Sequence, residues 1–422
     1  AALRLDLLHD DRGNNIKPSK NRRDSIYGAL TFQPSKNGTL YAEVESTHLR
    51  QKIPRTYAPF DWVNTWINAN RPIIPTAQRT TATNGVEFLT ANGYPVYIAG
   101  IGAMDWARMG YGARPLNRGT RTTATMSTSY GRGTPNRVLP LDRYWAGDAD
   151  RVDFDNENYT LIYQHKLADG LFLDVGAKHD HGYRENFDGN GFGFSIQVDP
   201  NAQLPNGRPN PNVGLPYNEQ APKWEKSGSD VNQLRATLSY ERDFRHVKIL
   251  RRGLGKFTVA GLYSNEATHN WLETLLEVNE TPLPGSVADL GDARNAIRRR
   301  WYFAPGATDY FVSNYAPINE NGIRSAWLPT VAPRNNFART GSLVLAAQGN
   351  LLDGLVAVTG GLRRDESVLS QTEYTEDARG VFSSGPWSGR ALPAMKGVGR
   401  PYLVGVVVNP HKHVSLFYNQ ST

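Results

Sequence analysis

The chain has 422 residues, 39% of them hydrophobic, with 40 glycines, 26 prolines, no cysteine and a formal net charge of +7. The lack of cysteine excludes disulfides and thiolate metal sites, and no apolar run approaches the roughly 18 residues of a membrane-spanning helix. A mean hydropathy of −0.52 still permits a transmembrane β-barrel, because barrel strands bury only alternate side chains in lipid.

The positive charge predicts a solvated surface rather than a nucleic-acid partner. Lysine and arginine number 47 against 40 acidic residues, and they are scattered along the chain. The one tight cluster, Arg298 to Arg300, lies in a long polar segment without a nucleic-acid-binding motif. The same charges suit contact with lipopolysaccharide phosphates or with an anionic ligand.

The chain opens inside a predicted strand, residues 3–7, and lacks the charged start and apolar core of a signal peptide. It stops just after another predicted strand, so we expect an internal fragment of a longer protein. The first predicted hairpin joins residues 25–33 to residues 39–49. On its second arm apolar and charged side chains alternate strictly, and Glu43 and Glu45 share one parity, which predicts a face toward a watery lumen.

The clearest predicted hairpin spans residues 159–181. Tyr159, Leu161 and Tyr163 fall on one parity of the first arm, and Leu171, Leu173, Val175 and Ala177 share a face of the second. A period of two predicts strands, and Ala168-Asp169-Gly170 between the arms supplies a tight turn. One face is therefore expected to be apolar and the other polar.

The same unit recurs along the chain. Residues 233–243 pair with 256–269, residues 341–349 with 355–366, and residues 400–408 with 414–420, which gives about ten strands of roughly nine to twelve residues, close to the length of a membrane-crossing strand. Between the hairpins lie long polar connections, residues 50–158, 182–232, 270–340 and 367–399. Tight turns that alternate with long loops are typical of outer-membrane barrels.

The expected fold class is therefore all-β, an antiparallel up-and-down transmembrane β-barrel, partial, of about ten to eleven strands, with long extracellular loops. Residues 1–422 form one partial barrel domain with no plug domain in this chain. Within the loops, residues 60–67 and residues 287–300 carry spacings that predict short helices.

All nine tryptophans fall in the long connections in this interpretation, where they either pack among themselves or line a binding surface. His179 and His181 share a strand face, but no third ligand accompanies them, so no metal site is expected. No catalytic motif or cofactor-binding motif is present, and we expect neither an enzyme nor a bound cofactor. The candidate ligand-binding residues are Trp62, Trp66, Trp106, Trp145, Trp271 and Trp301.

Three segments, residues 22–45, 352–366 and 400–422, resemble barrel hairpins of TonB-dependent outer-membrane receptors. Gly360-Gly361-Leu362-Arg363-Arg364-Asp365, at the outer end of a strand, and the strand Val414 to Asn419 carry the resemblance most clearly. The similarity covers most strand regions and little of the long loops. This chain departs from the family pattern, because it shows no plug, no TonB-contacting segment and no closing strand that ends in an aromatic residue.

The resemblance implies a location in the bacterial cell outer membrane and active uptake of a scarce nutrient, such as a ferric siderophore, cobalamin, haem or an oligosaccharide. It implies three kinds of partner: the TonB complex, reached through a plug domain absent from this chain, outer-membrane lipid and lipopolysaccharide, and the ligand itself. Two other functions stay open, a passive outer-membrane porin and a soluble β-rich carbohydrate-binding protein. The soluble protein would bury both faces of its sheet, whereas the porin would share the barrel and lack a plug.

Overall fold

The structure is a computed structural model of the chain. It describes residues 1–17, 19–52, 60–61, 63–68, 71, 73, 86–90, 95–98, 101–105, 110–115, 134–135, 138, 149–188, 195–199, 202–204, 207–245, 247, 253–280, 288–292, 295–303, 315–320, 323–385, 388–411 and 413–422.

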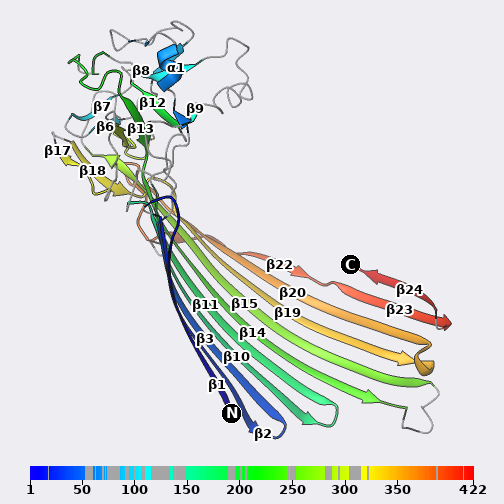
Figure 1. The fold of residues 1–422 in the computed structure, drawn as a ribbon. Helices are drawn as coiled ribbons and strands as arrows, with labels where there is room; N and C mark the ends of the chain where they lie inside the picture. The colour runs from blue at the N-terminus through cyan, green and yellow to red at the C-terminus, as the bar shows by residue number, and fades with distance from the viewer. Residues whose placement is uncertain are drawn as a thin grey trace.

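One large antiparallel sheet dominates the molecule and sweeps away from a smaller head, as Figure 1 shows. Eleven strands cross this sheet in chain order, each paired with the next along the sequence. The first and last strands lie at opposite edges, so the sheet is an open wall. The strands are β1 (Ala2–Gly13), β2 (Lys20–Ser35), β3 (Gly38–Lys52), β10 (Arg151–Ala168), β11 (Leu171–Asp188), β14 (Lys223–Asp243), β15 (Leu254–Asn279), β19 (Arg334–Leu351), β20 (Val356–Glu373), β23 (Tyr402–His411) and β24 (Val414–Ser421).

The predicted fold class is confirmed as an all-β, antiparallel, up-and-down sheet that forms a partial barrel wall. All five predicted hairpins are present with their predicted arms. The predicted strand length of nine to twelve residues is wrong for most of them, because β14 has 21 residues and β15 has 26. These strands continue far into the segments that were expected to be loops, since backbone pairing persists beyond the stretches in which apolar and polar side chains alternate strictly.

Gly170 sits in the turn between β10 and β11 with a φ of +73°, and a Cβ there would overlap with the carbonyl oxygen of Glu241 on β14. Gly354, in the turn η3 (Leu352–Gly354), has a φ of +90° but open space around the same position. We expect Gly354→Ala to lower the free energy of unfolding by about 1–2 kcal/mol through backbone strain alone, and Gly170→Ala to lower it by more. Denaturant titration of the two variants measures the difference, and equal losses would contradict the predicted overlap at Gly170.

The sheet has two chemically different faces, because residues directly opposite one another on neighbouring antiparallel strands point to the same side. The row through Leu161 contains Leu30, Ala42, Ala177 and Leu234, and so lies on an apolar face. The row one residue away, through Thr160, contains Ala29, Glu43, Lys178, Gln233 and Glu266, and so lies on a polar face. The predicted alternation of face along each hairpin is thus present, and Glu43 and Glu45 point to the polar side.

The head is built from the connections that leave one end of the sheet (Figure 1). Its described part contains a seven-stranded sheet in the order β7-β6-β16-β13-β12-β4-β9 and a separate pair, β5 and β8. None of the helices in the described residues is long and apolar enough to cross a membrane. The elements are β4 (Phe60–Asp61), α1 (Val63–Asn68), β5 (Val86–Thr90), β6 (Pro95–Ile98), β7 (Gly102–Asp105), β8 (Gly110–Pro115), β9 (Thr134–Pro135), β12 (Ser195–Val198), β13 (Pro216–Gln220) and β16 (Arg298–Tyr302).

Four further short strands extend the main sheet: β17 (Asn319–Glu320), β18 (Ile323–Leu328) and β21 (Arg390–Ala391) near the head, and β22 (Met395–Gly399) beside the middle of β20 (Figure 1). The helix predicted within residues 60–67 is confirmed as α1. The helix predicted for residues 287–300 is wrong, because the described part of that segment consists of turns, a bridge and the start of β16. Ile297, which contributed to the apparent helical spacing, instead packs against Ile318 and Ile323 in a small core.

Candidate functional site

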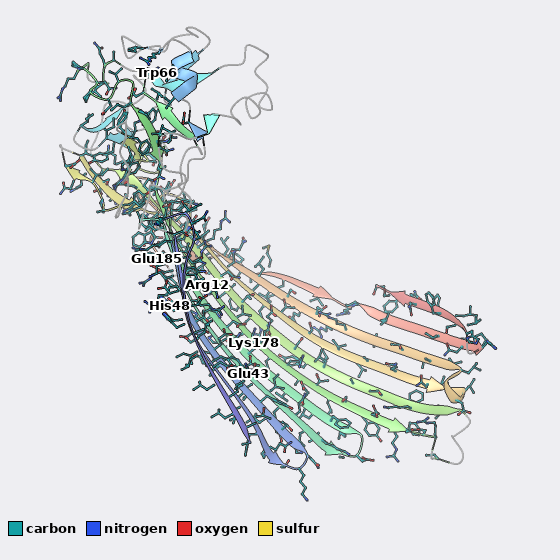
Figure 2. The ribbon with its side chains drawn as sticks, in the orientation of Figure 1. Arg12, Glu43, His48, Trp66, Lys178 and Glu185 are labelled. Carbon is teal, nitrogen blue, oxygen red and sulfur yellow. The ribbon has the colours of Figure 1, made fainter. Side chains whose placement is uncertain are left out.

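The polar face carries pairs of oppositely charged or hydrogen-bonding side chains that bridge neighbouring strands. On β14, Arg235 lies 3.2 Å from Asp174 of β11, whose other oxygen accepts a hydrogen bond from Gln164 of β10 at 2.9 Å. Gln233 donates to Glu266 of β15 at 2.8 Å. Such exposed pairs contribute little stability, but they keep an array of donors and acceptors on a surface suited to water and polar solutes. Figure 2 shows Glu43 and Lys178 of this face on the sheet, away from the head.

On the apolar face, each strand carries a run of apolar and tyrosine side chains that ends at a polar residue on the side of the head; nearer the turns, His165 on β10 and Arg242 on β14 are also polar. From β1 to β20, the polar residue that ends the run toward the head is His9, Asp24, Ser46, Glu157, His179, Asn232, Asn265, Arg339 and Arg364. Large side chains within the apolar stretch are exposed on this face, including Leu161 at 47%, Leu238 at 48% and Leu345 at 53%. Nothing among the described residues covers them.

The boundary between the apolar and polar parts of this face crosses the strands obliquely. The row of paired residues that starts at Leu7, the last apolar position on β1, reaches Ser370 on β20 after eight strand-to-strand steps. The last apolar position before the boundary on β20 is Leu362, and 370 − 362 gives a shift of 8 residues over those steps. A shift of about one residue per strand, with a rise of ~3.3 Å and a spacing of ~4.8 Å, corresponds to an angle of about 35°.

That angle equals the tilt of strands in transmembrane barrels, about 35–45° to the barrel axis. On β14, Arg242 and Asn232 bound the apolar run. The ten residue-to-residue steps from Asn232 to Arg242, at ~3.3 Å each and with this tilt, span about 27 Å, close to the ~25 Å apolar band of outer-membrane barrels. A flat apolar layer that cuts tilted strands accounts for both the slant and the height of the band.

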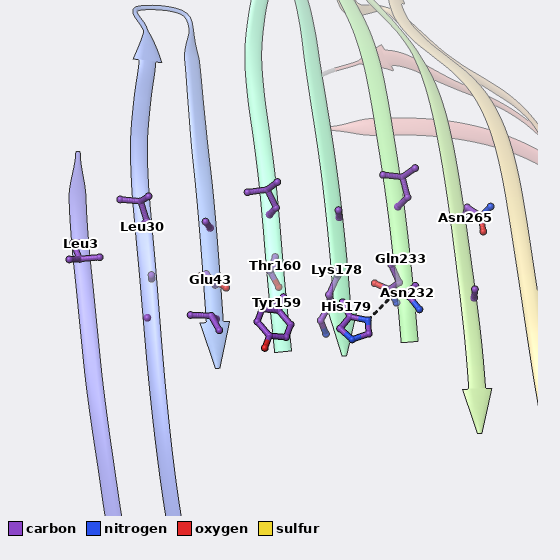
Figure 3. Close-up of a pocket in the computed structure, with 18 residues that line it drawn as sticks. Leu3, Leu30, Glu43, Tyr159, Thr160, Lys178, His179, Asn232, Gln233 and Asn265 are labelled. Atoms are coloured by element: carbon purple, nitrogen blue, oxygen red, sulfur yellow. Dashed lines mark hydrogen bonds between the residues drawn. The ribbon is translucent and has the colours of Figure 1, made fainter. Parts of the chain in front are cut away.

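A hollow of about 760 Å³ lies on the apolar face and is shown in Figure 3. Its floor is made of small residues such as Gly28, Ala42 and Ala177, and larger side chains such as Leu30 and Leu161 form its walls. A hollow with an apolar lining inside the apolar band suits acyl chains better than a polar nutrient.

A buried ionic network holds the head together. The guanidinium of Arg300 on β16 has a fully buried side chain and donates to Glu219 of β13 at 2.8 and 3.0 Å, and it lies 3.4 Å from Asp199. The hydroxyl of Tyr302 donates to Asp199 at 2.5 Å, and the guanidinium stacks over the ring of Tyr217 at 4.0 Å. The network joins residues more than eighty positions apart in the sequence, so it fixes two long connections against each other.

Electrostatics keep this network in one protonation state. Burial opposes the charge on Arg300, but the surrounding Tyr302, Tyr217, Glu219 and Asp199 outweigh it and hold the pKa of Arg300 well above its usual value. Burial also raises the pKa of Tyr302 well above its usual value, and the Asp199 carboxylate adds to that shift. The arginine therefore stays charged, and the phenol stays a donor.

A second pair links the head to the wall. Arg299, the neighbour of Arg300 in the sequence, forms two hydrogen bonds of 2.7 Å with the carboxylate of Glu277, near the outer end of β15. Ser325 of β18 also donates to Glu277, at 2.6 Å. The Arg298 to Arg300 cluster, which the sequence suggested was a solvated charge run, is thus largely buried, because the acidic partners that it needs lie far away in the sequence.

The six candidate tryptophans do not form one site within the described part of the chain. Trp62, Trp106 and Trp145 lie outside the described residues, and Trp66 lies on α1 at the far end of the head (Figure 2). Trp271 covers Gly228 on the neighbouring strand so closely that a Cβ there would overlap with its ring nitrogen. Trp301 packs edge-on against Tyr315 at 6.2 Å.

The expectation that all tryptophans lie in the connections is wrong, because four described tryptophans lie in strands, two where β14 and β15 extend beyond the apolar band and two on the short strands β16 and β18. They are Trp224, Trp271, Trp301 and Trp327. Trp224 and Trp327 both contact Phe187, with ring centroids 6.0 and 5.1 Å apart, and this aromatic cluster forms a small core where the sheet enters the head. No pattern in the sequence marks this cluster, since its three members come from three separate strands.

No family model and no curated protein matches the chain. Solved structures match over nearly its whole length at low identity. The ferric-catecholate import receptor Fiu from E. coli K12 has a TM-score of 0.47 at 12% identity, with 99% of this chain and 49% of that chain covered. BauA, the ferric preacinetobactin receptor from Acinetobacter baumannii, has a TM-score of 0.46 at 9% identity, with coverages of 99% and 42%. The ferripyoverdine receptor of the outer membrane of Pseudomonas aeruginosa has a TM-score of 0.34 at 10% identity, with coverages of 99% and 51%.

The chain therefore spans about half the length of these proteins or less. Its fold and its two faces define its class, a partial wall of an up-and-down β-barrel with a head at one end.

Proposed function

We propose that the chain forms part of an outer-membrane transporter that takes up a scarce nutrient, with the apolar face against lipid and the polar face toward the lumen. The observation that supports this best is the oblique apolar band, whose slant and height match a membrane layer. A soluble carbohydrate-binding protein would cover such a face with a second layer. The head, built from the long connections, would then face the outside and capture the ligand.

Active uptake with TonB-derived energy is the finer part of the proposal. It rests on the resemblance of three hairpins to TonB-dependent receptors. We propose further that the protein is a receptor and not an enzyme, and that the ligand is a ferric siderophore, cobalamin, haem or an oligosaccharide. Of the described candidate tryptophans, Trp66 is the best placed to meet a ligand, because it lies at the far end of the head and is half-buried.

A growth experiment tests this function. We expect the full-length protein to restore growth on one of the four nutrient classes in a bacterial strain that lacks its own receptor for that nutrient. Growth should be lost when the same strain also lacks TonB, since an energy-coupled receptor cannot import without it. Growth that persists without TonB would instead indicate a passive porin, and no growth on any of the four would overturn the proposed ligand classes.

Trp66→Ala gives a prediction of its own. Loss of one aromatic stacking surface should weaken ligand binding about 5- to 10-fold, measured as the nutrient concentration that supports half-maximal growth. The matched control is Trp271→Phe, at a tryptophan that packs on β15 and β14, which should leave that concentration unchanged. An unchanged value for Trp66→Ala would remove this residue from the candidate binding surface.

A further inference from the structure

One row of uncharged residues crosses the polar face from β2 to β20. Its members lie directly opposite one another on neighbouring strands, so all of them belong to the same face of the sheet. From β10 to β20 the row lies on the head side of the apolar band, because the residues that end the band, such as Glu157 and Asn232, are nearer the turns. The members of this neutral row are Ser25, Thr47, Asn156, Gly182, Ser229, Asn270, Asn336 and Gln371.

The neutral row contains hydrogen-bonding groups that no protein group uses. Elsewhere on the polar face such groups are paired with each other, as when Gln233 donates to Glu266 at 2.8 Å. Within the row, Ser25 and Thr47 hydrogen-bond with each other at 2.8 Å. Four other members have side chains that make no hydrogen bond within the described part of the chain: Asn156, Ser229, Asn270 and Asn336. Their donors and acceptors are therefore available to a ligand.

Gly182 opens a slot in the row between Asn156 and Ser229. A Cβ at Gly182 would lie 3.8 Å from the amide oxygen of Asn156 and 3.8 Å from the ring of Phe154, so both side chains flank the glycine. The ring of Phe154 offers an apolar surface next to an amide and a hydroxyl. This combination suits a sugar ring, whose C–H face packs on an aromatic ring while its hydroxyls both donate and accept hydrogen bonds.

The spacing of the row suits an extended chain of hydroxylated units. Neighbouring strands lie ~4.8 Å apart, close to the repeat of a hexose chain, and the four steps from Asn156 to Asn336 cover about 19 Å. An anionic ferric chelate would need cations in the row, and the row contains none. Two cations, Arg184 and Arg334, lie on the same face two residues further toward the head, which makes the charge of the ligand testable.

We propose that the neutral row binds an uncharged oligosaccharide along the lumen wall. The hydrogen-bonding residues are Asn156, Ser229, Asn270 and Asn336, and the stacking residue is Phe154. The inference rests on the proposed function, because it requires that the polar face lines the lumen, and it selects one of the four proposed nutrient classes. A ligand captured by the head would meet this row before it reaches the level of the apolar band.

Isothermal titration calorimetry of the full-length protein in detergent tests the site. The probe is the tightest binder from a panel of uncharged hexose and pentose oligosaccharides, and a panel without any binder would overturn the proposal. We expect Asn270→Ala and Asn336→Ala each to weaken binding about fivefold, through the loss of one hydrogen bond. Gly182→Val should weaken binding more, because it fills the slot. The strand should accept this change, since a Cβ there meets only ordinary contacts.

Matched controls lie on the same face. Gly176 is also on β11, and a Cβ there would likewise meet only ordinary contacts, at 3.9 Å. Gln233 is an amide on β14 that already has a partner in Glu266. Gly176→Val and Gln233→Ala should therefore leave oligosaccharide binding unchanged. If these two variants weakened binding as much as Gly182→Val and Asn270→Ala do, the losses would not depend on the row, and the site would be overturned.

The charge of the ligand gives a separate test. Arg184→Gln should leave binding unchanged, because an uncharged sugar offers no anion to the guanidinium. A larger loss for Arg184→Gln than for Asn270→Ala would indicate an anionic ligand and overturn the uncharged one.

The growth experiment separates this inference from the proposed function. If the protein supports TonB-dependent growth on a ferric siderophore, cobalamin or haem and binds no oligosaccharide, the neutral row fails as a sugar site and the transport function stands. If the protein binds an oligosaccharide through the row but supports growth on none of the four nutrient classes, the sugar site stands and the transport function fails.

Discussion

Leu238→Arg is expected to destabilise the folded protein in lipid vesicles by about 2–4 kcal/mol, the cost of an arginine on the lipid face near the middle of the bilayer. Leu238 lies on the apolar face of β14 between Tyr240 and Ala236, and it is 48% exposed to the medium around the sheet, water or lipid. In water such a substitution would cost little, because an exposed surface tolerates charge. The size of the loss therefore reports the medium that this face meets, and urea titration of the protein folded in vesicles measures it.

The adjacent residue provides the control. Thr237 points to the polar face opposite Asp174 of β11. Thr237→Arg places the same side chain one position away, in a polar surrounding with a carboxylate nearby, and should change the free energy of unfolding by less than about 1 kcal/mol. Equal losses for the two variants would mean that the apolar face does not contact lipid, and the transport proposal would lose its main support.

The hairpins were predictable because their information is local. Within residues 159–181, Leu161 and Ala177 share a face by simple alternation, and Gly170 marks the turn between them. The short connections also predicted which two strands pair within each hairpin. The oblique boundary of the apolar band could not be predicted from such local patterns, because it depends on how Leu7 aligns through seven intervening strands with Ser370. The register between two strands joined by a long connection cannot be read from the sequence of either strand. The slant of the apolar band is therefore visible only in the assembled sheet.

The head could not be predicted for a related reason. The spacing within residues 287–300 favours a helix locally, but Arg298 to Arg300 form a strand that pairs with β6 and β13. The strand is favoured over the helix because it brings Arg299 and Arg300 to carboxylates that are distant in the sequence. The tryptophans show the same limit. Trp224 looked like a loop residue because both faces of β14 are polar beyond the band, although backbone pairing continues through it. In both examples the secondary structure is determined by tertiary contacts with residues that are distant in the sequence, which a short stretch of sequence does not contain.

Arg300→Met is expected to lower the stability of the head by about 3–5 kcal/mol, because it leaves buried carboxylates without their cation. Glu219 and Asp199 are 5% and 0% exposed, so water cannot replace the guanidinium. The loss should be confined to the head, since the hairpins of the wall pair through their own backbones. Hydrogen exchange measures this directly: amides of β13 and β16 should exchange faster, while those of the β10 and β11 hairpin keep their rates.

An exposed pair gives the matched control for that loss. Arg245 lies 2.5 Å from Asp243 at the turn end of the wall, with 62% of its side chain exposed. Arg245→Met removes the same kind of ion pair and should cost less than about 1 kcal/mol, because water solvates the remaining carboxylate. If Arg300→Met were as mild, the head would not depend on this network. If instead the head unfolds while the wall stays folded, the variant should still insert into the membrane but bind its ligand more weakly. The reason is that the two connections that Arg300 joins would no longer be held in one arrangement.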